Sequence, residues 1–206
     1  MTSHHALPPV WFRLPPGFHD IGLTDRELLD GMAEALGSPD AQRELAQLMD
    51  GLDQLSGHDV VHTSICFHPD APGSVTTALF SLTTQRLEQP NPRLSVARTA
   101  LSIARATLWR SSHRRFIELP SALPCYLISG VISVPGLERE LFQARAATAH
   151  ADGIHLLVLD LTSASTQHAD AYTDILEAIV HTMSFADPAP SKPTSAGTSR
   201  IQELLR

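Results

Sequence analysis

The apolar run Ile154-His155-Leu156-Leu157-Val158-Leu159-Asp160-Leu161 decides the fold of this sequence. It has the length and composition of a buried β-strand. After a polar break at 162–166, apolar residues recur at helical spacing as far as Phe185. The stretch 153–185 therefore predicts a strand followed by an amphipathic helix that folds back onto it. We expect that helix to bury Ala171, Ile175, Ala178, Ile179, Thr182 and Met183.

The pair Asp152-Gly153, directly before the apolar run, is a strong hairpin-turn signal. It makes the run an antiparallel strand, whereas the run alone is typical of a parallel one. Further strands are expected at 10–14, 58–68, 74–83, 114–119 and 123–134. A long helix is expected at 94–109, with Leu94, Ala97, Leu101, Ala104 and Leu108 facing inward.

Two helix signals stand near the N-terminus. Thr24-Asp25-Arg26-Glu27 forms a capping box, and Pro39 suits the first turn of a second helix. Together they predict an N-terminal helical hairpin at about 24–56. Residues 1–9 are expected to be a disordered lead, and 186–206 a Pro/Ala/Ser-rich tail with a short terminal helix. Residues 10–185 then form a single α+β domain.

Composition narrows the function classes. The 206 residues carry a formal net charge of −7, with 43% hydrophobic and 18% charged residues. Nucleic acids and anionic membranes bind clustered Lys and Arg, so the charge argues against both as partners. No apolar run reaches the roughly 20 residues of a membrane span, and the N-terminus lacks signal-peptide features, so we expect a cytoplasmic protein.

Motifs for catalysis are not found in the sequence, and no catalytic residue, cofactor or metal site is predicted. Phosphate loops, GxSxG elbows, HExxH and CxxC patterns are all missing. His62, Cys66 and His68 have zinc-ligand chemistry, but along one strand they spread over more than about 12 Å. Cys125 stands in an apolar run without a neighbouring cation, which favours a buried structural thiol.

The order of elements and the closing stretch resemble the PsbP-like fold. Leu14-Pro15-Pro16-Gly17-Phe18 is similar to its opening strand and turn, and Met183-Ser184-Phe185 to its close. The resemblance implies an α/β/α sandwich, a mostly antiparallel sheet of about six strands flanked by helices. It also implies a protein that usually lacks catalysis. Relatives include photosystem PsbP, the DcrB and LpqN lipoproteins, and the Eag chaperones of type VI secretion.

The leading hypothesis is a non-catalytic adaptor or chaperone that is accessory to a bacterial secretion or toxin system. Such a protein would bind another protein or an apolar peptide at an exposed face or edge of its sheet. Candidate binding residues are Trp11, Arg114, Arg115 and Asp160. The basic cluster around Arg114 suits an acidic partner, or is a solvated helix–strand connection. Two alternatives stay open: an acidic immunity protein that neutralises a basic toxin, and an enzyme or small-ligand binder that uses His62, Cys66, Asp160 or Arg115.

Overall fold

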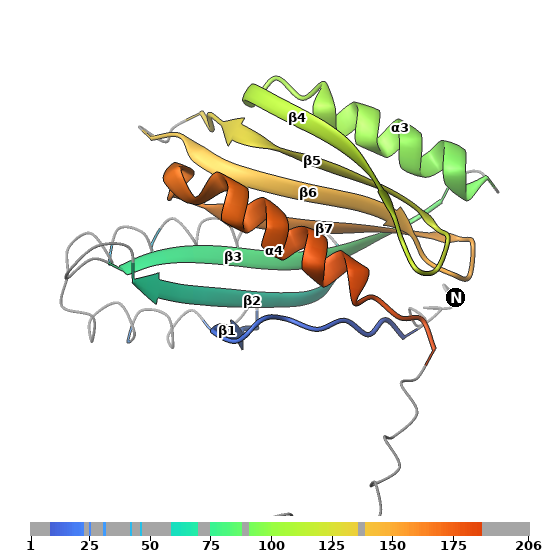
Figure 1. Ribbon diagram of the computed structural model, residues 1–206, viewed down its shortest axis with the longest axis horizontal. Helices are drawn as coiled ribbons and strands as arrows, with labels where there is room; N and C mark the ends of the chain where they lie inside the picture. Colours follow the sequence, from blue (N-terminus) through green and yellow to red (C-terminus); the bar gives the residue numbers. More distant parts are fainter. Residues whose placement is uncertain are drawn as a thin grey trace, which may run out of the picture.

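The computed structural model describes residues 9–22, 25, 31, 42, 46, 59–69, 75–87, 91–135 and 139–186. Within them, seven antiparallel strands form one sheet in the order β1-β2-β3-β7-β6-β5-β4 (Figure 1). The strands are β1 (Phe18–Asp20), β2 (Asp59–Pro69), β3 (Val75–Arg86), β4 (Trp109–Glu118), β5 (Pro124–Ile132), β6 (Leu141–Ala149) and β7 (His155–Ser163). The helices are α3 (Pro92–Ala104), the 3-10 turn η1 (Thr166–His168) and α4 (Ala169–His181).

Strand β7 is the apolar run of the sequence, and it lies at the centre of the sheet. It pairs antiparallel with β3 on one side and with β6 on the other. Leu156 and Leu157 point to opposite faces and both are buried, at 1% and 0% exposure. The run is continuous rather than alternating because both faces of this strand are covered. The predicted antiparallel strand and the turn before it are confirmed.

The two α-helices pack on opposite faces of the sheet. Leu176 and Ile179 of α4 pack in one core cluster with Phe80 and Leu159. Val96 of α3 belongs to a second cluster with Ala147, Ala149 and Leu156. Strand β6 lies under both helices. Its small side chains allow the two helices to approach the same strand from either side.

The buried faces of both helices differ from the prediction. Ile179 and Met183 are buried as predicted. The other buried residues of α4 are Tyr172, Leu176 and Val180, and Ala171 and Ala178 are exposed. Helix α3 buries Val96 and Ala100, which leaves Leu94 at 41% and Leu101 at 39% exposure. One residue is about 100° of helical rotation, so a small error in phase moves apolar residues from the core to the surface.

The predicted fold class is wrong. We expected an α/β/α sandwich on about six strands, flanked by helices, with an N-terminal helical hairpin. The sheet has seven strands, and the helices with defined bounds are α3 and α4 with 13 residues each, one on each face, so the described fold is strand-rich. The hairpin is not among the described elements. Its span, 24–56, lies outside the described residues except for Asp25, Gly31, Gln42 and Ala46.

Two element boundaries also need correction. The strand expected at 10–14 forms only a single bridge, Trp11 with Ser184, and the edge strand is β1 at Phe18–Asp20. Helix α3 ends at Ala104, and β4 starts at Trp109, where the indole N–H donates to the Ile103 carbonyl at 2.7 Å. The predicted lead and tail fall outside the described residues except for Pro9 and Ala186. Among described helices, none is long and apolar enough to cross a membrane.

Candidate functional site

The free edge of the sheet at β4 is the candidate functional site. Strand β4 pairs only with β5 in the described structure, and it is the last strand on that side (Figure 1). From Ser111 to Glu118 its register with β5 is unbroken. One side of an eight-residue stretch of backbone therefore has no described strand partner. Such an edge is a template for a further strand.

The start of β4 is fixed by a β-bulge and by a close backbone contact. The register shifts between Trp109 and Ser111, so Arg110 is the extra residue. Gly130 of β5 lies opposite Ser112, and a Cβ built on it would be 2.0 Å from the Ser111 carbonyl oxygen. Only glycine permits this approach of the two backbones. A glycine inside an apolar strand was the sequence signal for it.

Arg114 and Arg115 are adjacent on β4 and point to opposite faces. Arg115, 51% exposed, forms an ion pair with Glu177 of α4. Arg114 faces the side of α3, and no ion pair of Arg114 is found among the described residues. Arg110 approaches Glu140 at 3.8 Å. Strand β4 thus carries three guanidinium groups, two of which are paired with carboxylates of neighbouring segments, although the chain as a whole carries −7.

Exposed apolar side chains gather on the same part of the chain. Six large hydrophobic residues are exposed in the described part, and four of them belong to α3, β4 or the turn between them: Leu94, Leu101, Leu108 and Phe116. Phe116 is 53% exposed and packs edge-to-face on Tyr126, with ring centroids 5.3 Å apart. Exposed apolar side chains mark an interaction surface where they form a contiguous patch, and Phe116 is the one that lies on the free edge itself.

Trp11 is placed elsewhere. Its backbone N–H donates to the Ser184 carbonyl at 2.9 Å and its carbonyl accepts from the Ser184 N–H at 2.8 Å. Arg13 N–H donates to Thr182 Oγ1 at 2.9 Å nearby. These bonds fasten the N-terminal segment to the end of α4. The structure gives Trp11 a tethering position.

Asp160 is a buried member of the central strand. It is 8% exposed, and it forms an ion pair with Arg145, its directly opposite residue on β6. Arg114 lies in the same cross-strand row, beyond Arg145 and Ile128. Three strand spacings of about 4.8 Å put Asp160 about 14 Å from Arg114. The four predicted binding residues therefore do not converge on one site.

The thiols are unsuited to nucleophilic catalysis. Cys125 is 0% exposed, and burial together with the nearby Glu177 carboxylate raises its pKa to about 12. Burial also raises the pKa of Cys66. Both cysteines are free. A thiol with a raised pKa carries almost no thiolate at neutral pH.

His62 borders an open hollow beside β1. The hollow has a volume of about 440 Å³ and is lined by Asp20, Ile21, Gly22, Asp25, Val60, Val61, His62 and Thr63. His62 Nε2 is 3.3 Å from Asp20 Oδ1, and Gly22 N–H donates to Asp25 Oδ2 at 2.7 Å. In the described parts of the chain, no three His, Cys, Asp or Glu residues are placed to hold a metal ion.

A buried polar chain joins α4 to the sheet, and the sequence did not indicate it. Ser163 Oγ donates to the Thr77 carbonyl at 2.7 Å and lies 3.2 Å from the Tyr172 hydroxyl. That hydroxyl is 3.2 Å from His68 Nε2. Ser163 and Tyr172 are 1% and 2% exposed. At that burial, and with Ser163 bonded to a backbone carbonyl, the chain holds elements together rather than presenting a nucleophile.

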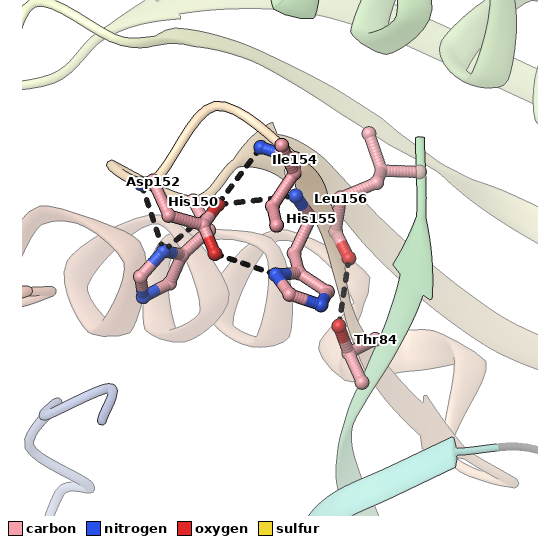
Figure 2. A network of polar contacts seen from close by, with 6 residues as sticks. All are labelled: Thr84, His150, Asp152, Ile154, His155 and Leu156. Carbon is pink, nitrogen blue, oxygen red and sulfur yellow. Dashed lines mark hydrogen bonds and ion pairs between the residues drawn. The ribbon is translucent and has the colours of Figure 1, made fainter. Parts of the chain in front are cut away.

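The turn before β7 carries a second polar network (Figure 2). Asp152 Oδ1 accepts from the Ile154 and His155 N–H groups at 2.9 and 3.1 Å, and its Oδ2 is 2.5 Å from His155 Nδ1. His150 Nδ1 accepts from the Asp152 N–H at 3.0 Å. His150 Nε2 is a buried atom without a hydrogen-bond partner in the described structure. The His150 ring packs against Phe185, with centroids 4.6 Å apart.

The charge of Asp152 is expected to make stability depend on pH. Burial raises the pKa of Asp152, but hydrogen bonds from the His155 ring and two backbone N–H groups, with the nearby His150, outweigh burial and hold the pKa below its ordinary value. The stabilisation is present above the ordinary aspartate pKa near 4 and is lost as pH falls through the lower folded value.

We expect Asp152→Asn to cost about 0.5–1 kcal/mol at pH 7, since the amide keeps the turn acceptor and loses the charge. Urea unfolding at pH values from 7 to 3 measures the difference in free energy of unfolding between the variant and the parent protein. This difference should shrink below about pH 4. Asp174→Asn, on the exposed face of α4, is the matched control for charge. A difference as large at pH 3 as at pH 7 would contradict the assignment.

Comparison with known proteins finds similarity in structure alone. No model of a known protein family matches the sequence, and no curated protein matches it. The chain is similar to a crystal structure of LpqN, which is described as involved in cell envelope biogenesis of Mycobacterium tuberculosis. The TM-score is 0.51 with 11% identity, over 88% of this chain and 86% of LpqN. At that identity the likeness shows a shared fold.

Proposed function

We propose that this protein is a non-catalytic, PsbP-like adaptor that binds another polypeptide at the free edge of β4. The observation that carries the proposal is the open backbone edge from Ser111 to Glu118, flanked by the exposed Phe116. The partner adds a strand to the sheet and forms main-chain hydrogen bonds with β4. The exposed apolar side chains of α3 extend the contact surface.

Two further observations support this proposal. The described cysteines are protonated at neutral pH, which takes them out of nucleophilic catalysis. The edge is long and regular, whereas edges that only avoid aggregation are typically short or broken by bulges. The bulge of β4 is confined to Arg110 and leaves the following eight residues in unbroken register with β5.

Site-directed photocrosslinking in the native cell tests the proposal. A photoreactive amino acid replaces His113 on the outer edge of β4. In a matched variant it replaces His19 of β1, an exposed histidine at the opposite edge of the sheet. We expect a discrete polypeptide adduct at position 113 that is weaker or missing at 19. Peptide mapping of the adduct should find one segment of the partner. Equal labelling at both positions, or none at 113, would overturn the proposal.

A further inference from the structure

If the proposed function holds, the charged residues of β4 indicate which kind of polypeptide segment binds at this edge. Strand alternation puts His113 and Arg115 on the face covered by α4, and Arg114 and Phe116 on the face of α3. The contacts agree, because Arg115 reaches Glu177 of α4 and Phe116 packs on Tyr126. Arg114 thus gives the face of α3 a positive charge beside the exposed Phe116 ring, and on the face of α4 the Arg115 guanidinium is paired with Glu177.

We propose that the segment bound at β4 is extended and acidic, with an apolar or aromatic residue next to its carboxylates. Opposite Arg114 and Arg115, acidic side chains form cross-strand ion pairs, and opposite Phe116 an apolar side chain covers the exposed ring. In an antiparallel partner this corresponds to an apolar residue followed by two or three acidic residues. Arg115 binds the carboxylate of the partner while it keeps its ion pair with Glu177.

A second copy of this chain fits the edge poorly. Antiparallel pairing of two β4 edges sets an arginine opposite an arginine in each of the registers that pair at least seven of the residues 111–118 with the other copy. Arg114 meets Arg114 or Arg115 of the other copy, or Arg115 meets its own counterpart. Like charges directly opposite each other are destabilising. The charge of the edge therefore favours a partner of opposite charge over self-association.

Peptide titration of the full chain tests this inference. The probe is a blocked eight-residue peptide, Thr-Val-Phe-Glu-Asp-Glu-Val-Thr, and its control has lysine at the three acidic positions. Binding is measured by fluorescence anisotropy, and the site by amide hydrogen exchange of Ser111–Glu118. We expect the acidic peptide to slow exchange in β4, since added main-chain hydrogen bonds protect its outer N–H groups. The lysine peptide should bind at least tenfold more weakly.

Two charge reversals locate the effect. Arg114→Glu should weaken binding of the acidic peptide at least tenfold. Arg13→Glu, an equal charge change on the exposed N-terminal segment beside the end of α4, should change it less than twofold. Circular dichroism confirms that both variants fold. Increased salt should weaken binding of the acidic peptide to the parent protein, because exposed ion pairs are screened.

The outcomes separate the two proposals. The inference is supported if only the acidic peptide slows amide exchange in β4 and if the Arg114→Glu variant loses binding of that peptide. Equal protection by both peptides overturns the acidic partner and leaves edge binding in place. No protection of β4 by the acidic peptide at millimolar concentration overturns the inference. If position 113 also gives no crosslink in the cell, the proposed function is overturned with it.

Discussion

Replacement of Gly130 by alanine is expected to lower the free energy of unfolding by about 3 kcal/mol and to displace β4 from β5. The added Cβ would stand 2.0 Å from the Ser111 carbonyl oxygen and 2.9 Å from the Ser112 Cα. These are backbone atoms, so no side chain can rotate away. Overpacking costs typically about 1–3 kcal/mol, and a backbone obstacle places this site at the upper end.

Urea unfolding and amide exchange measure the effect. Ser129→Ala, the neighbouring position on β5, is the matched control, because it adds no atom and should cost less than about 0.5 kcal/mol. Faster exchange in Gly130→Ala should be concentrated in β4, with β7 remaining protected. A stability within about 0.5 kcal/mol of the parent protein would show that the two backbones can separate freely, and that Gly130 does not set the position of the edge.

The sequence predicted the centre of this fold better than its margins. A continuous apolar run allows one interpretation at 154–161, a buried strand, and β7 occupies His155–Ser163. The Asp152-Gly153 turn then set its direction correctly. Near the N-terminus, Val10-Trp11-Phe12 has strand composition, but only Trp11 makes a bridge. A short apolar segment is used there to cover the core, and composition does not distinguish that role from pairing.

The buried faces of the helices were predicted less well for a different reason. A predicted inward face depends on phase, and in α3 the leucines that looked like core residues are exposed at Leu94 and Leu101. The rotation of α3 about its axis is set by its packing on β5 and β6, and Val96 and Ala100 are the residues that this packing buries. That constraint comes from tertiary packing, which one segment of sequence does not contain.

The sequence predicted only part of the candidate site. Arg114 and Arg115 formed the only basic cluster, and they do lie on the free edge. That β4 is an edge, however, follows from strand order, which depends on pairing between distant segments. Asp160 looked like a site residue because a carboxylate that closes an apolar strand can lie at the sheet edge or at the mouth of a pocket. Its opposite residue, Arg145, could be identified only once the register of β6 and β7 was known.

Asp160→Ala is therefore expected to act on stability and to leave the binding edge unchanged. The substitution leaves the Arg145 guanidinium without its carboxylate on a covered face of the sheet. Removal of one partner from a buried pair costs about 3–5 kcal/mol. The Arg145 side chain is 35% exposed and can still hydrate, so we expect about 2–3 kcal/mol by urea unfolding.

A double-mutant cycle isolates the pair. Arg145→Ala alone should cost about 1–2 kcal/mol, and the double variant should cost less than the sum of the single variants by about 1–2 kcal/mol, since the second substitution removes the charge left by the first. Strict additivity would show that the two charges do not interact. The acidic peptide should bind Asp160→Ala with the parent affinity at a temperature where the variant is folded, because about 14 Å of sheet separates Asp160 from Arg114. A tenfold loss of binding would instead place Asp160 in the binding surface, as its sequence pattern first suggested.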